Sequence, residues 1–98
     1  MKNQAQVGLC VAAAGMLTLT VAQNAFASLG SDCVQYAWNL GNQVCMSETT
    51  LTNCFHFGPV GNPNGCDYIC GSDQPCLENC LNVAWEYQWN VSMQYPVC

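Results

Sequence analysis

Basic side chains are almost absent from this sequence of 98 residues. Lys2 is the only lysine or arginine, against six aspartates and glutamates. Nucleic-acid binding needs lysine and arginine to neutralise phosphates, and attraction to an anionic membrane needs a basic face. An inhibitor of trypsin-like proteases also needs a basic side chain for the specificity pocket. The shortage of cations therefore argues against all three classes, and against membrane insertion by a basic lytic peptide.

Catalytic and metal-binding signatures are also missing. The chain has one histidine, His56, and no G-x-S-x-G, H-E-x-x-H or paired-carboxylate pattern accompanies it. A histidine without a marked nucleophile or partner does not define an active site. Asp67, Asp73 and Glu78 do not form a looped calcium motif. We therefore expect a non-enzymatic protein without metal or cofactor, with His56 in a surface loop between two packed phenylalanines.

The N-terminus has the three parts of a secretory leader. A short polar start with one lysine precedes an apolar run over residues 7–21, and small residues follow up to Ala27. The run is shorter than the roughly 20 residues that span a bilayer. We therefore predict a signal peptide over residues 1–27 and an exported, disulfide-rich domain over residues 28–98.

What the chain has in abundance is cysteine. It has nine, and Cys10 lies in the expected leader, so eight remain in the domain that follows. An even number in a short exported chain indicates a disulfide framework. Each bridge contributes about 3 kcal/mol, mainly by restricting the unfolded chain, and a domain of this size is marginally stable without such help. We predict disulfides among Cys33, Cys45, Cys54, Cys66, Cys70, Cys76, Cys80 and Cys98.

Two C-x3-C pairs lie close together in the segment CDYICGSDQPCLENC. A zinc site built from all four thiolates is the competing interpretation. The short gap between the pairs and the oxidising environment of an exported chain favour disulfides, and redox enzymes use the shorter C-x-x-C spacing. In two antiparallel helices, Cys70 would face Cys76 and Cys66 would face Cys80. Other pairings stay open.

Helical spacing of apolar residues begins early in the expected domain. It predicts a helix over about residues 32–46, capped by Ser31 or Asp32. Gly41 disfavours the helical conformation and can end this helix early. The segment MSETTLTNCFHF that follows favours a second short helix, because Ser47 can cap it, although its threonines also suit an extended piece.

The second half of the chain has clearer helix signals. CDYIC can form one helical turn that ends at Gly71. Ser72 or Asp73 can then cap a helix over residues 75–90, whose apolar residues recur at three- and four-residue intervals. A glycine- and proline-rich loop over residues 58–65 separates the halves. We predict an all-α, disulfide-stapled bundle of about three short helices with one such loop.

The aromatic residues of the last expected helix are the best candidates for a contact surface. Trp85 and Trp89 are four residues apart, so they share one side of a helix. Large exposed aromatics mark partner surfaces, whereas the alternative is that they only cover the disulfides as a thin core. We select Trp85, Trp89, Glu78 and Glu86 as the binding residues, with Phe57 as a further aromatic candidate.

One short modification pattern lies at the end of this helix. Asn90-Val91-Ser92 is an acceptor sequence for N-linked glycosylation. The pattern matters only where a eukaryotic secretory pathway handles the chain. Asn90 is therefore a candidate glycosylation site.

Several features of the expected domain occur together in one known family. They are the eight cysteines, the acidic balance, the C-x3-C pairs, the segment ENCLNVAWEYQWN and the final Cys98. With them the chain resembles the secreted pheromones of Euplotes-type ciliates, which are small, acidic, disulfide-rich bundles of about three short helices. The resemblance implies a soluble signalling protein that binds a cell-surface receptor and self-associates.

We therefore expect a secreted, extracellular signalling ligand that binds a protein receptor. The alternative is a secreted inhibitor or effector that inserts the loop between Cys54 and Cys66 into an enzyme cleft. A structural protein of the cell surface is the third interpretation.

Overall fold

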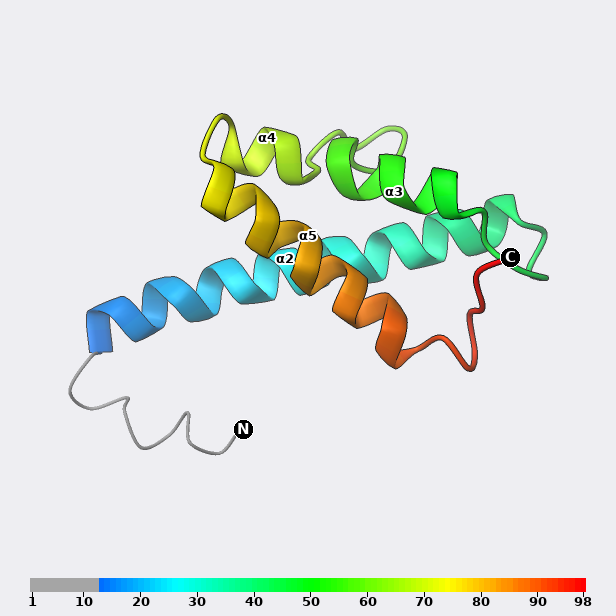
Figure 1. Cartoon of the computed structure of the whole chain (residues 1–98), viewed down its shortest axis with the longest axis horizontal. Coiled ribbons are helices and arrows are strands. Elements are labelled where there is room, and N and C mark those ends of the chain that lie inside the picture. Colours follow the sequence, from blue (N-terminus) through cyan, green and yellow to red (C-terminus); the bar gives the residue numbers. More distant parts are fainter. Residues whose placement is uncertain (1–12) are drawn as a thin grey trace.

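A computed structural model of the chain describes residues 13–98, and it describes side-chain surroundings from residue 24 onward. The helices of this part are α2 (Ala13–Leu40), α3 (Glu48–Phe57), α4 (Cys66–Cys70) and α5 (Gln74–Asn90). Figure 1 shows α3 and α4 on one side of the long α2, and α5 crossing α2 at a steep angle. The predicted all-α class is confirmed for this part of the chain.

The crossing of α2 and α5 depends on Gly30. A β-carbon at this position would lie 3.0 Å from Cβ of Tyr87 and 3.1 Å from the carbonyl oxygen of Ala84. Both neighbours belong to α5, so the absence of a side chain lets the two backbones approach closely.

The core is a single cluster that α2, α3 and α5 build together. On α2, the buried residues recur three and four positions apart, which places them on one stripe of the helix. The stripe packs against buried residues of α3 and of α5. The cluster includes Phe26, Leu29, Cys33, Val34, Ala37, Met46, Leu51, Cys54, Phe55, Cys66, Cys80 and Ala84.

The first helix differs from its prediction at both ends. We expected residues 32–46 with a cap at Ser31 or Asp32, but α2 spans Ala13–Leu40 and continues through both residues. The alanine-rich segment before Ser31 has no helix-breaking proline, so no cap is required there. The helix ends at Leu40 because Asn42 and Gln43 adopt left-handed φ angles of 58° and 60° after Gly41.

The predicted cleavage position lies inside α2. The side chain of Phe26, next to Ala27 in the predicted leader, is only 3 % exposed and belongs to the core. The core-facing stripe of α2 therefore starts before the expected cut. The first twelve residues of the predicted signal peptide lie outside the described part, and the leader stays a prediction.

Local capping signals of the shorter helices are confirmed. The Ser47 hydroxyl accepts a hydrogen bond from the Thr50 amide at 3.3 Å and caps α3. The Asp73 carboxylate accepts one from the Cys76 amide at 3.2 Å and caps α5. Gly71 ends α4 with a φ of 60°, a conformation that glycine adopts without strain.

All eight cysteines of the expected domain form disulfides. The Cα–Cα distances of the four bridges lie within the ordinary range. They are 5.6 Å for Cys33–Cys54, 5.1 Å for Cys45–Cys98, 5.8 Å for Cys66–Cys80 and 5.5 Å for Cys70–Cys76. The nested pairing expected between α4 and α5 is confirmed. The bridges join Cys33 with Cys54, Cys45 with Cys98, Cys66 with Cys80, and Cys70 with Cys76.

The C-terminal segment is fastened to the turn after α2. The Met46 amide donates to the Pro96 carbonyl at 2.8 Å, and the Cys98 amide donates to the Met46 carbonyl at 2.8 Å. Tyr95 packs edge-on against Trp38 with ring centroids 5.2 Å apart. Together with the Cys45–Cys98 disulfide, these contacts return the end of the chain to the end of α2 (Figure 1).

Candidate functional site

The solvent side of α5 brings together three of the four residues selected for binding. The buried side of this helix is the stripe Cys80, Ala84 and Gln88. At about 100° per residue, Trp89 lies about 20° from Glu78 around the helix axis, and Glu86 lies about 80° from Glu78. All three side chains are exposed. We call Glu78, Glu86 and Trp89, with the exposed Asn82 between them, the α5 face.

Trp89 is the most prominent member of the α5 face. Its side chain is 78 % exposed, although indole is a large apolar group that usually gains free energy from burial. Met93, one turn further along the chain, is 96 % exposed. Exposed aromatics of this kind are enriched among residues that dominate protein interfaces.

Trp85 has a different position from Trp89. It is half-buried, and its ring packs edge-on against Phe55 of α3, with centroids 5.0 Å apart and an angle of 84° between the planes. Phe55 is completely buried. This contact holds α5 against α3, so the placement of Trp85 favours the alternative of a core-covering aromatic.

The charge of the α5 face is not compensated by the described part of the chain. In residues 24–98, the only contact between a basic side chain and a carboxylate joins His56 Nδ1 and Asp67 Oδ1, 2.9 Å apart, and it lies on α3 and α4. Glu78 and Glu86 therefore face solvent without a cationic partner from these residues. Opposite charges on a binding partner would increase the rate of association with this face.

The prediction that His56 lies in a surface loop between two packed phenylalanines is wrong in two respects. His56 lies in the last turn of α3 and not in a loop, because the helix continues to Phe57. Of its two neighbours, Phe55 is buried but Phe57 is 59 % exposed, since adjacent helical residues point in different directions. The contact with Asp67 links the end of α3 to the start of α4.

The loop over residues 58–65 is closed at its base. A β-carbon on Gly65 would lie 2.5 Å from the Gly58 amide nitrogen and 2.4 Å from the His56 carbonyl oxygen. Only glycine at position 65 permits this approach, and Gly58 has a φ of 90°. The segment has the shape of a compact Ω-loop. At its tip, Val60 is 82 % exposed.

Disulfides and hydrogen bonds hold the loop on both sides. Cys54, before the loop, is bridged to α2, and Cys66, after it, is bridged to α5. Inside the loop, the Asn62 amide donates to the Pro59 carbonyl at 2.9 Å, and Asn64 Nδ2 donates to Asn62 Oδ1 at 3.0 Å. The conformation of the loop is therefore fixed by contacts within it and on both sides of it.

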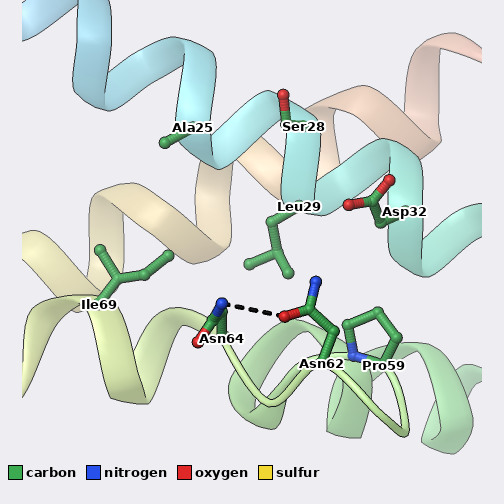
Figure 2. A pocket seen from close by; sticks show the side chains of 8 residues that line it. All are labelled: Ala25, Ser28, Leu29, Asp32, Pro59, Asn62, Asn64 and Ile69. Carbon is green, nitrogen blue, oxygen red and sulfur yellow. Dashed lines mark hydrogen bonds between the residues drawn. The ribbon is translucent and has the colours of Figure 1, made fainter.

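Two shallow cavities flank the loop. One, of about 240 Å³, opens between the loop, α4 and α2 (Figure 2), and the other, of about 320 Å³, lies between α2 and α3. Asp32 is the only charged residue that lines either of them. The first is lined by Ala25, Ser28, Leu29, Asp32, Pro59, Asn62, Asn64 and Ile69, the second by Tyr36, Leu40, Thr50, Asn53, Cys54, Phe57, Gly58 and Val60.

Two structural roles were not predicted from the sequence. Gln88 is 4 % exposed and donates through Nε2 to the Tyr95 carbonyl at 3.3 Å, so it joins α5 to the C-terminal segment. Its spacing of four from Ala84 was the signal that placed it on the buried stripe. The Phe55–Trp85 contact had no comparable signal.

Comparison with known proteins gives no assignment, because no family model, curated protein or solved structure matches the chain. Among the helices of the described part, none is both long enough and apolar enough to cross a membrane. The four disulfides are compatible with an extracellular protein. A functional assignment therefore has to be argued from the α5 face and the loop themselves.

Proposed function

We propose that this protein is a secreted, non-enzymatic, pheromone-like signalling ligand that binds a cell-surface receptor through the α5 face. The observation that carries the proposal is the exposure of Trp89, 78 %, on a helix whose exposed carboxylates, Glu78 and Glu86, lack cationic partners in the described residues. An indole side chain supplies a large contact area, and tryptophan is enriched among the residues that dominate binding energy.

The rigidity of the framework supports this role. The start of α5 is joined to α4 by two disulfides. The segment after α5 is joined to the end of α2 by the Cys45–Cys98 bridge. A face held in this way loses little conformational entropy on binding, so more of the contact energy appears as affinity. Recognition would follow the mode in which one side of a helix docks into a receptor groove.

The proposal implies a receptor that has an apolar pocket with basic groups around it. The pocket accepts Trp89, and the basic groups pair with Glu78 and Glu86. Charge complementarity of this kind contributes mainly to specificity and association rate, and an inserted aromatic contributes mainly to affinity. Salt should therefore slow association more than it speeds dissociation.

Binding of labelled, fully oxidised protein to intact cells from its own source tests the proposal. We expect saturable binding that unlabelled protein displaces, and a loss of at least tenfold in affinity for Trp89→Ala. Glu86→Gln should slow association, whereas the matched charge change Glu48→Gln on α3 should not. Equal binding by wild type and Trp89→Ala would refute a role for the α5 face. Sedimentation over a range of concentrations would measure the self-association that the family resemblance implies.

The geometry of the loop favours a second function. Inhibition of an enzyme by loop insertion requires a rigid, exposed segment, and the loop from Phe57 to Gly65 is closed at its base with Val60 exposed at its tip. An apolar tip suits an enzyme with an apolar pocket. Inhibition assays against extracellular proteases of this specificity test it. Replacing residues 60–64 should abolish inhibition but spare cell binding, and Trp89→Ala should do the reverse.

A further inference from the structure

Asn90 ends α5 beside the exposed Trp89. Its own side chain is exposed, and no other asparagine in the sequence is followed by the same acceptor pattern. In Figure 1 this end of α5 points away from α3 and α4. A large group attached to Asn90 would therefore extend into solvent without displacing a packed element.

We propose that Asn90 carries an N-linked glycan and that the first sugars of this glycan cover Trp89. The transfer forms a bond between Nδ2 of Asn90 and the anomeric carbon of a lipid-linked oligosaccharide. The bond from that carbon to the lipid diphosphate breaks, the diphosphate leaves with the electron pair, and Nδ2 loses one proton. The oligosaccharyl donor is the only co-reactant, and Ser92 completes the acceptor sequence.

The exposed apolar side chains next to Asn90 are the reason to expect that the first sugars cover Trp89. Trp89 and Met93, on either side of the acceptor sequence, are 78 % and 96 % exposed. The helix ends between them, and the Ser92 hydroxyl donates to the Trp89 carbonyl at 2.9 Å, which holds the chain in a turn at this point. The C–H faces of a pyranose ring are apolar, so packing them on the indole ring removes apolar surface from water.

The mass of the protein secreted by eukaryotic cells, expressed as the full chain with its own leader, tests the modification. We expect added hexose and N-acetylhexosamine, attached to the peptide that contains Asn90. Asn90→Gln and Ser92→Ala should both lose this mass, whereas Ser92→Thr, which keeps the acceptor pattern, should retain it. Wild-type protein without added sugar would overturn the proposal.

Quenching of tryptophan fluorescence by acrylamide tests the covering of Trp89. Enzymatic removal of the glycan should increase the quenching of wild-type protein, because the most exposed indole becomes accessible. The same treatment of Trp89→Phe should leave quenching unchanged. Equal quenching of the glycosylated and deglycosylated wild-type forms would overturn the covering, even with Asn90 modified.

Neither measurement uses a receptor, so their outcome is separate from that of the proposed function. One consequence does rest on that function: a glycan over Trp89 would determine what fraction of the secreted protein presents the α5 face. Cell binding by the glycosylated form should then be weaker than by the deglycosylated form. Equal binding by the two forms would contradict this consequence alone.

Discussion

The position of Phe26 allows a test of where the folded domain begins. Its side chain is 3 % exposed in the core, yet it precedes Ala27, after which we predict cleavage of the leader. A chain that starts at Asn24 keeps this side chain, and a chain that starts at Ser28 lacks it. The two chains should therefore differ in stability by the contribution of one buried phenylalanine and part of a helical turn.

The magnitude follows from the burial of the ring. Removing a buried phenylalanine loses its transfer free energy and leaves a cavity, and phenylalanine-to-alanine changes in cores destabilise by about 3–5 kcal/mol. Among the residues of α2 whose side chains are described, Phe26 is the first buried one, and we use the lower end of this range for it. We therefore expect Phe26→Ala to lower the free energy of unfolding by about 3 kcal/mol in the chain that starts at Asn24.

Equilibrium unfolding in guanidinium chloride, followed by circular dichroism with disulfides intact, is the assay. Phe26→Ala should shift the midpoint without changing the slope, and the chain that starts at Ser28 should show a loss of similar size. Asn24→Ala, an exposed change on the same helix, should change the free energy of unfolding by less than about 0.5 kcal/mol. A Phe26→Ala protein as stable as its parent would refute the inclusion of this residue in the core.

Three further predictions concern other parts of the bundle. A double-mutant cycle with Phe55→Leu and Trp85→Leu, measured by unfolding, should give a coupling of about 1 kcal/mol, since edge-on aromatic pairs contribute that much; additive losses would contradict the contact. Replacing Cys45 and Cys98 by serine opens a loop with a sequence separation of 53 and should destabilise by about 4 kcal/mol, compared with about 2 kcal/mol for the bridge with a separation of 6. A calorimetric ranking in the opposite order would refute the loop-entropy argument. Gly65→Ala should displace the base of the loop and increase proteolysis between residues 58 and 65, whereas unchanged proteolysis would show that the close approach is dispensable.

Several features of the fold were determined by the sequence alone. Ser47 and Asp73 predicted the starts of α3 and α5, because a capping side chain accepts a hydrogen bond from an amide only three residues away. The even number of cysteines predicted complete pairing. The close spacing of the C-x3-C pairs led to the correct nested bridges between α4 and α5, since so short a connection leaves two antiparallel turns few arrangements.

Other features were decided only by the tertiary structure. The burial of Phe26 depends on packing against elements that lie far away in the sequence, and no local signal reports such packing. The disulfide partners of Cys33 and Cys45 also depend on tertiary packing. So does the difference between Trp85, which packs against Phe55, and Trp89, which is exposed. Helical spacing limits which side of a helix a residue occupies, but the neighbouring helices determine which positions on that side become buried.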